Sequence, residues 1–326
     1  MKKRKLISST SEPAVDKKKF LTDDSYHNDD KCDETVLVKS GKKINLDILK
    51  NYKDSVKEEL ETHANKVKKR TIANRNKLLK EELKPLEDPP CTSWEKEISA
   101  HRLDHSFFHS PCEELATKLL GKVLVRKLDN GAILKGLIVE TESYLGGLDK
   151  ASQSYQNKVT PRNVPMYMPP GTIYIYMTYG MYHCFNLSSL GEGSAVLIRA
   201  LEPLEGIEYM VINRKAKSRS KNAKTINKTL EIDQLCNGPS KLCMAFQLEK
   251  CHSKYSICTW KNLWLENSLA EESITVVSCP RIGIDSAGIE WASKHLRYYI
   301  YNNKFVSKRD KKIESLIQSS LNKERL

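Results

Sequence analysis

The chain has 326 residues, enough for one large domain or two ordinary ones with a sizeable core. Its formal net charge is +13, and after residue 100 there are 31 Lys and Arg against 22 Asp and Glu. No apolar run approaches the roughly 20 residues that span a bilayer, and the N-terminus lacks the apolar core of a secretory signal. We therefore expect no membrane association and a polyanionic partner, with a merely soluble basic surface as the alternative.

The nine cysteines follow no disulfide or zinc pattern. Their number is odd, their spacing is scattered and no C-x-x-C pair occurs, which favours reduced thiols in an intracellular compartment. His101, His105 and His109 recur every fourth residue and could line a helix face, but no further ligand accompanies them. We therefore predict no metal site.

The first part of the chain differs in composition from the rest. Residues 1–95 are dense in charge and poor in aromatics, so they cannot bury enough apolar area to offset their ordering entropy. Basic clusters at residues 2–5 and 17–19 are typical of nuclear import signals, although short Lys runs also occur in solvated tails. We predict a disordered charged tail over residues 1–95, a folded domain over 96–310 and a charged tail over 311–326.

The folded domain is predicted to begin with a helix and a hairpin. Apolar residues at helix spacing run from 115 to 120 and end at Gly121, a suitable C-terminal stop. Residues 123–125 and 132–140 are predicted strands, joined by the Asp-Asn-Gly turn at 129–131.

The next predicted strand carries two carboxylates. Residues 138–144 read IVETESY, in which Glu140, Glu142 and Tyr144 share one face by alternation. A carboxylate taken out of water needs a partner, and Arg199, which ends a later apolar strand, is the natural counterion. The pattern indicates either a general base beside an aromatic pocket or an edge strand with its polar face in solvent.

The most aromatic stretch is residues 171–186, GTIYIYMTYGMYHCFN. Its first half alternates, so one face is aliphatic and the other carries Tyr174 and Tyr176. Seven of the 14 tyrosines lie between Tyr144 and Tyr182. Tyrosine has high strand propensity, but clustered aromatics on a basic protein are also the usual platform for stacking nucleobases.

A basic, acid-free segment separates Glu208 from Glu231. A solvated loop is the ordinary explanation, but inside a basic domain we expect it to follow a phosphate backbone. Residues 238–241, GPSK, mark a turn that opens a short helix whose N–H groups could also receive a phosphate. Residues 274–277 and 298–301 are predicted to close the sheet. The expected backbone contacts are Arg214, Lys217, Arg219, Lys221 and Lys241.

Five segments together resemble the alkyladenine (3-methyladenine) DNA glycosylase family of the mammalian type. They are VETESY (139–144), TPRNVPMYMPPGTIYIYMTYGMYHCFN (160–186), LIRALEPLEG (197–206), GPSKLC (238–243) and PRIGID (280–285). Their order and spacing match from about residue 103 to about 306, which is far more specific than one short pattern. The resemblance implies a mixed α/β (α+β) fold, with a single domain, a curved antiparallel β-sheet flanked by helices, no metal and no cofactor.

The resemblance also implies an activity. A monofunctional glycosylase of base excision repair flips a damaged purine out of duplex DNA and hydrolyses its N-glycosidic bond with an activated water. The expected substrates are 3-methyladenine and 7-methylguanine, with hypoxanthine left open. We expect a nuclear monomer whose partner is double-stranded DNA containing damaged purines.

Three residues carry over to the reaction itself. Glu142 matches the general base that activates water, and Arg199 matches the arginine that helps to hold that water. Tyr179 matches the side chain that wedges into the duplex where the base was. The chemistry agrees, because alkylated purines are cationic and prefer aromatic faces, and a carboxylate stabilises an oxocarbenium-like sugar.

Five residues are expected to contact the substrate. Tyr144 and Tyr176 match aromatic walls, Asn186 matches the residue that screens purines at their 2-position, and Leu197 belongs to the same set. Gln153 departs from the family pattern, which has histidine at the corresponding position. A planar amide can cover a base but cannot take a positive charge, so we expect cationic lesions to be favoured over neutral ones.

Two other classes of function are weighed against this one. A non-enzymatic DNA-damage or structure-specific binder on the same fold would lack turnover, and intact Glu142 and Arg199 argue against it. A metal-dependent nuclease needs several clustered carboxylates, and the strands of the folded part offer only Glu140 and Glu142.

Overall fold

The computed structural model describes residues 85–216, 230–269 and 273–324, together with the isolated residues 57, 62 and 83. All of these except residue 57 belong to one compact unit that begins at Thr62. Most of the predicted N-terminal tail lies outside the described residues, and so do Lys217, Arg219 and Lys221 of the basic segment.

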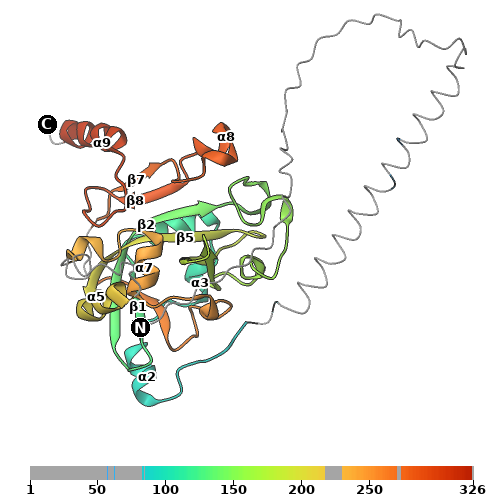
Figure 1. Cartoon of the computed structure of the whole chain (residues 1–326). Helices are drawn as coiled ribbons and strands as arrows, with labels where there is room; N and C mark the ends of the chain where they lie inside the picture. Colours follow the sequence, from blue (N-terminus) through green and yellow to red (C-terminus); the bar gives the residue numbers. More distant parts are fainter. Residues whose placement is uncertain are drawn as a thin grey trace, which may run out of the picture. The chain divides into compact units, whose positions relative to one another are not determined.

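An antiparallel sheet of eight strands forms the centre of the described region (Figure 1). Six strands follow the order β3-β4-β5-β2-β1-β6, and β8 pairs with both β2 and β7. The strands are β1 (Val123–Lys127), β2 (Ile133–Tyr144), β3 (Ile173–Thr178), β4 (Tyr182–Ser188), β5 (Ala195–Glu205), β6 (Leu263–Glu266), β7 (Val276–Cys279) and β8 (Arg297–Ile300).

Short helices and 3-10 turns surround this sheet (Figure 1). The α-helices are α2 (Ser93–Ile98), α3 (His105–Phe108), α4 (Cys112–Lys118), α5 (Ile207–Ala216), α7 (Pro239–Ala245), α8 (Ile289–Ala292) and α9 (Lys311–Glu324). A single mixed α/β domain built on a large antiparallel sheet confirms the predicted fold class.

The predicted helix and hairpin at the start of the domain are α4, β1 and β2. Leu115, Ala116 and Leu119 are fully buried, as the helix spacing predicts, and the chain leaves the helix through Gly121 at φ 78°. They join the main hydrophobic core together with Ile138 of β2. Burial of this apolar stripe fixes α4 against the sheet.

β2 is the longest strand and lies in the interior of the sheet. It pairs with β1 over its first half, with β5 along its length and with β8 through residues 140–142. Its register with β5 shifts on both sides of Glu140, and such irregularities increase the local bend and twist. Glu140 and Glu142 are both fully buried, so the edge-strand alternative for this segment is wrong.

The tyrosine-rich stretch folds back on itself as the hairpin of β3 and β4. Tyr179 and Gly180, both at positive φ (51° and 66°), make the turn. β3 is a terminal strand, and the segment after α7 covers part of its outer edge: Ile173 N donates to Tyr255 O at 2.8 Å and Ile175 N to Ser253 Oγ at 2.8 Å. This cover satisfies backbone groups that an open edge would expose.

The packed region extends beyond residues 96 and 310 at both ends. Leu86 forms a β-bridge with Tyr255, and Glu95 of α2 pairs with Lys127 of β1 at 2.7 Å. At the other end, Ile313 and Ile317 of α9 pack against a second hydrophobic cluster. Both segments therefore belong to the folded domain rather than to charged tails.

Candidate active site

A cavity of about 300 Å³ opens where β2, β3, β4 and β5 lie side by side. Half of its lining residues come from those four strands, and the others from the β3–β4 turn and from the segments that carry Gln153, Met166, Pro239 and residues 282–284. All of the residues predicted to contact the substrate line it: Tyr144, Gln153, Tyr176, Asn186 and Leu197. Arg199 and Tyr179 line it as well.

Strand register explains why distant segments meet here. Tyr174 of β3 pairs with Asn186 of β4, Asn186 pairs with Leu197 of β5, and Leu197 pairs with Glu142 of β2. Glu142 in turn pairs with Arg297 of β8. Directly paired residues point to the same face of a sheet, so this row places its five side chains on one side.

Glu142 is fully buried behind the cavity wall and is held by three donors. The Tyr144 hydroxyl donates to its Oε2 at 3.0 Å, Arg199 Nη1 lies 3.1 Å from the same oxygen, and Ile282 N donates to Oε1 at 2.8 Å. All three donors line the cavity, whereas Glu142 itself stands behind them. Oε1 has one partner among the described residues, so it retains a lone pair for a further donor.

Tyr144 is a donor in this arrangement. Burial, together with the neighbouring Glu142 carboxylate, raises the pKa of Tyr144 well above its ordinary value. The hydroxyl therefore keeps its proton near neutral pH and donates it in the hydrogen bond to Glu142.

Arg199 joins the two carboxylates of β2. Its Nε donates to Glu140 Oε1 at 3.0 Å and its Nη1 faces Glu142 Oε2 at 3.1 Å. Burial by itself lowers the pKa of Arg199, but the charges of Glu142 and Glu140 outweigh this and raise it above its ordinary value. The guanidinium is therefore a fixed positive charge at the cavity wall.

Glu140 has a different environment from Glu142. Its Oε1 accepts from Arg199, from Arg297 Nη1 at 2.9 Å and from Ser307 Oγ at 2.9 Å, and its Oε2 accepts from Ser307 N at 2.7 Å. It does not line the cavity. Glu140 therefore has both oxygens occupied by donors that lie away from the cavity, apart from Arg199, whereas all three donors to Glu142 line the cavity.

A buried ion pair holds the loop that leads from Tyr144 to Gln153. Arg281 binds both oxygens of Asp149, at 2.6 and 2.9 Å, and both side chains are fully buried. The Arg281 guanidinium also lies 4.8 Å from the centre of the Tyr144 ring, and Arg281 Nη1 donates to Ser143 O at 2.9 Å. The pair thus fixes one aromatic wall of the cavity from behind.

The opposite part of the lining belongs to the β3–β4 hairpin. The rings of Tyr174 and Tyr176 lie 5.2 Å apart, and the amide nitrogen of Asn186 donates to the carbonyls of Tyr174 at 3.1 Å and of Cys184 at 3.3 Å. These bonds fix the orientation of the Asn186 side chain at the cavity floor.

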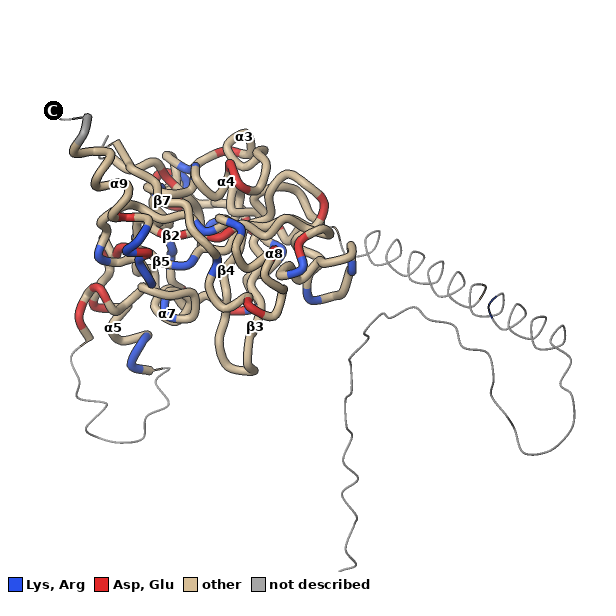
Figure 2. The backbone as a smooth tube through the Cα atoms, turned by 90° about the horizontal axis from the view of Figure 1, so that it is seen from above, with Lys and Arg blue, Asp and Glu red and all other residues tan. Residues whose placement is uncertain are grey.

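The turn of this hairpin projects from the domain as an uncharged segment (Figure 2). Tyr179 is 86% exposed at its tip, and Met181 and Tyr182 are partly exposed beside it. Exposed apolar side chains grouped next to a cavity are typical of a binding surface. A tyrosine at positive φ is also an uncommon conformation, of the kind that occurs at functional sites.

The predicted phosphate contacts are only partly placed by the structure. Arg214 Nη1 donates to the carbonyls of Gln234 and Leu235, so this guanidinium holds the following loop. Lys241 Nζ binds Asn237 Oδ1 at 2.7 Å, and burial lowers the pKa of its ammonium group. Their contact with DNA stays a prediction.

Several contacts around the site could not be recognised in the sequence. Asp149 and Arg281 are 132 residues apart, and Ser307 is 167 residues from Glu140.

Within the described ranges, no group of three or more His, Cys, Asp or Glu is arranged to hold a metal ion. The helices of those ranges include none that is long and apolar enough to cross a membrane.

Known proteins are similar to this chain in sequence. The family model for methylpurine-DNA glycosylase matches residues 106–304. The mouse DNA-3-methyladenine glycosylase is 45% identical over 219 residues, which cover 67% of this chain and 64% of the mouse protein. The human DNA-3-methyladenine glycosylase is also 45% identical over 219 residues, covering 67% and 72%. A putative 3-methyladenine DNA glycosylase of Clostridium tetani is 43% identical over 211 residues, covering 64% of this chain and 100% of that protein.

Proposed function

Because the chain belongs to the methylpurine-DNA glycosylase family, we propose that it is a monofunctional DNA glycosylase that removes damaged purines from duplex DNA. The observation that carries this proposal is Glu142, a fully buried carboxylate held by three donors at an aromatic-lined cavity. At about 300 Å³ the cavity lies at the lower end of the range for small-molecule sites, which suits one flipped base.

The flipped base enters between aromatic side chains. Tyr144 and Tyr176 line the cavity, and a purine alkylated on the ring carries positive charge that aromatic faces attract. Tyr179, exposed on the hairpin tip, fills the space that the base leaves in the duplex. The inserted side chain offsets part of the cost of unstacking.

Glu142 activates the water that replaces the base. Its Oε1 retains a lone pair, to which a water donates and then transfers its proton as the water oxygen bonds to the anomeric carbon. The bond from that carbon to the purine nitrogen breaks, and its electron pair leaves with the base. The Glu142 carboxylate, before it takes the proton, stabilises the oxocarbenium-like sugar as the bond to the base lengthens.

Arg199 and Tyr144 keep Glu142 in position for this step. Both donate to Oε2, so the carboxylate cannot rotate without losing two hydrogen bonds, and Oε1 stays directed away from them. Glu140 accepts a hydrogen bond from Arg199 Nε, and its negative charge offsets the positive charge of the guanidinium. Arg199 therefore adds no uncompensated positive charge beside the sugar as the sugar becomes cationic.

The substrate class follows from the same chemistry. Cationic bases such as 3-methyladenine and 7-methylguanine leave without prior protonation, whereas neutral hypoxanthine depends on contacts within the cavity. Gln153 lines the cavity but cannot donate a charge-assisted hydrogen bond, so we assign the cationic lesions as the preferred substrates. We further propose that the protein acts as a monomer, and that it acts in the nucleus on the basis of the basic clusters at residues 2–5 and 17–19.

Release of free base from duplex DNA containing 7-methylguanine, measured in the presence of a chelator, tests the proposal. We expect release at a rate that the chelator leaves unchanged, with an intact abasic strand as the product. A protein that binds the damaged duplex but releases no base would instead be a damage-binding protein. Loss of activity in chelator would point to metal-dependent chemistry.

A further inference from the structure

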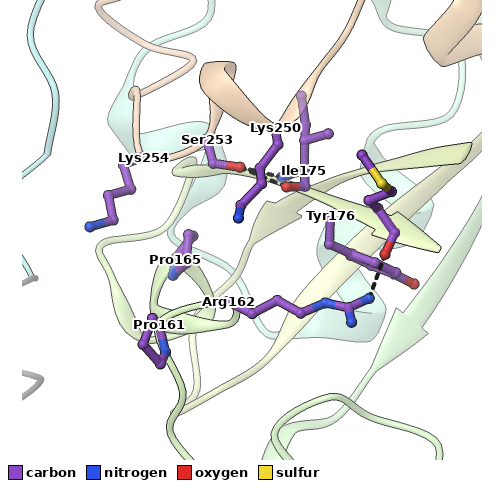
Figure 3. Close-up of a pocket in the computed structure, with 9 residues that line it drawn as sticks. Pro161, Arg162, Pro165, Ile175, Tyr176, Lys250, Ser253 and Lys254 are labelled. Atoms are coloured by element: carbon purple, nitrogen blue, oxygen red, sulfur yellow. Dashed lines mark hydrogen bonds between the residues drawn. The ribbon is translucent and has the colours of Figure 1, made fainter. Parts of the chain in front are cut away.

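A second cavity, of about 370 Å³, lies against the outer edge of β3 (Figure 3). Three chain segments build it: residues 161–165, residues 175–177 and residues 250–254. Tyr176 lines this second cavity and the base cavity alike. The two cavities are therefore neighbours that share one aromatic wall.

The lining of the second cavity is strongly basic. Arg162, Lys250 and Lys254 contribute to it, and none of the acidic residues that the structure describes does. Most of the remaining surface is apolar, with prolines from one loop and Ile175 and Met177 from β3. Figure 3 shows Arg162 and Lys250 extending into the same space from different loops. Arg162 and Lys250 above an apolar floor form a site for an anion.

Arg162 is held in place before any ligand arrives. Its Nη2 donates to Met177 O at 2.8 Å, and its guanidinium lies 4.9 Å from the centre of the Tyr176 ring (Figure 3). The bond to Met177 uses one of the five N–H donors of the guanidinium. A side chain that is already oriented loses less entropy on binding a phosphate.

The loop that carries the lysines is also anchored. Ser253 Oγ donates to Ile175 O at 2.9 Å and accepts from Ile175 N at 2.8 Å, as the dashed lines in Figure 3 show. Lys254 N donates to Ile173 O at 2.9 Å. The loop thus continues the hydrogen bonding of the sheet edge, so Lys250 projects from a fixed support.

The position of the second cavity relative to Tyr179 suggests its ligand. Met177 lines the cavity, and Tyr179 follows two residues later at the exposed hairpin tip. Two residues of a strand span about 7 Å, which equals about two steps of roughly 3.4 Å along one strand of B-DNA. DNA that receives Tyr179 and runs along β3 carries its backbone close to the second cavity.

We infer that the second cavity binds a backbone phosphate of the DNA, about two nucleotides from the displaced base. This inference rests on the proposed glycosylase function and adds a contact on the far side of β3 from the chemistry. Such a contact carries no sequence information, but it fixes the register of the duplex against the hairpin. It thereby directs the damaged nucleotide to the base cavity.

Salt-dependent binding of the full chain tests the site. The probe is a duplex with a central abasic analogue that the protein cannot cleave, titrated at several KCl concentrations. A plot of log K against log salt has a negative slope, and each lost phosphate contact makes that slope less steep by about 0.9. We expect Lys250→Ala to make the slope less steep by about that amount, and Lys250→Glu to weaken binding further at every salt concentration.

The matched control is Lys312→Ala, which removes one exposed lysine from α9, away from β3 in Figure 2. Its slope should equal that of the unaltered protein. If Lys250→Ala also leaves the slope unchanged while the unaltered protein releases base normally, the inference is overturned and the proposed function stands. An unaltered protein that releases no base would instead contradict the proposed function.

A neutral phosphate locates the contact on the DNA. A single methylphosphonate two nucleotides from the abasic analogue should weaken binding of the unaltered protein severalfold. With Lys250→Ala, the same methylphosphonate should have little further effect, because the two changes remove the same interaction. If the losses of affinity from the methylphosphonate and from Lys250→Ala are fully additive, the two changes remove different interactions and the inference is overturned.

Discussion

Glu140 and Glu142 lie two residues apart on β2, and both are fully buried, yet their surroundings differ. Glu140 accepts four hydrogen bonds from Arg199, Arg297 and Ser307. Glu142 accepts from donors that line the base cavity, and its Oε1 keeps a free lone pair among the described residues. The difference arises because Arg297 of β8 and Ser307, in the segment after β8, also donate to Glu140.

Replacement of Glu142 by Gln should abolish base release while DNA binding stays nearly intact. The amide has the same shape but cannot take the proton of the attacking water, and loss of a general base typically costs 10²- to 10⁴-fold in rate, on the order of 3–5 kcal/mol. Single-turnover base release and the dissociation constant for an abasic analogue measure the two effects. Glu205→Gln, at the exposed end of β5, is the matched control. Release at the parental rate would assign the base to another residue.

Gln153 should set the preference between cationic and neutral bases. It lines the base cavity, and Asn163 Nδ2 binds its backbone carbonyl at 2.8 Å, so the backbone should keep its position when the side chain changes. We expect Gln153→His to raise the rate on hypoxanthine relative to 7-methylguanine severalfold, which corresponds to one hydrogen bond of about 1 kcal/mol. Matched duplexes under single-turnover conditions give the ratio. An unchanged ratio would mean that the side chain at this position has no part in specificity.

At the scale of elements, the segment between β8 and α9 reaches into the network around the active site. Ser307 donates twice to Glu140, and Arg199 Nη2 lies 3.4 Å from the Ser307 hydroxyl. Arg297 adds a bond from its Nη1 to Lys308 O at 2.7 Å, which ties the same segment to β8. The orientation of Arg199 therefore depends on a part of the chain that contributes nothing to the cavity lining.

Ser307→Ala should slow base release by about tenfold, since hydrogen bonds to charged groups contribute about 1.5–3 kcal/mol. DNA affinity should change little, because Ser307 does not line the cavity. Ser307→Thr keeps the hydroxyl and should restore most of the rate. Ser315→Ala, which removes an exposed hydroxyl from α9, is the control. A rate loss matched by an equal loss of binding would indicate general disruption rather than a role in positioning Arg199.

At the scale of the whole molecule, the folded domain begins before the segment that resembles the family. Leu86 bridges Tyr255, Asp88 pairs with Lys261 at 2.8 Å, and Thr92 caps α2. The contacts of Leu86 and Asp88 hold the chain against the segment that follows Lys250. Truncation at two different points should therefore have different consequences.

A chain that starts at residue 85 should unfold at the same temperature as the full protein and release base at the same single-turnover rate. A chain that starts at residue 96 loses the Leu86 bridge and the Thr92 cap, and we expect it to lose about 1–3 kcal/mol of unfolding free energy. Thermal unfolding of the three proteins measures this difference. Equal unfolding temperatures would show that residues 85–95 add nothing to the stability of the domain.

Local patterns predicted most of the elements, because periodicity and turn chemistry depend on neighbouring residues. The α4 stripe, the Asp-Asn-Gly turn before β2 and the alternation of β3 all appear in the structure as predicted. The aromatic stretch was predicted only as far as one strand, and its second half is β4, paired antiparallel to the first. Motif spacing also indicated the family, which the match over residues 106–304 confirms.

Contacts between distant segments could not be predicted in this way. The row from Tyr174 to Arg297 depends on the registers of four strand pairs, and a slip of one residue in any of them would turn a side chain to the other face. The Asp149–Arg281 ion pair and the hydrogen bonds from Ser307 to Glu140 join residues more than a hundred positions apart. Burial alone makes such pairs necessary, since a charge removed from water must find a partner, but only the folded chain specifies which partner it finds.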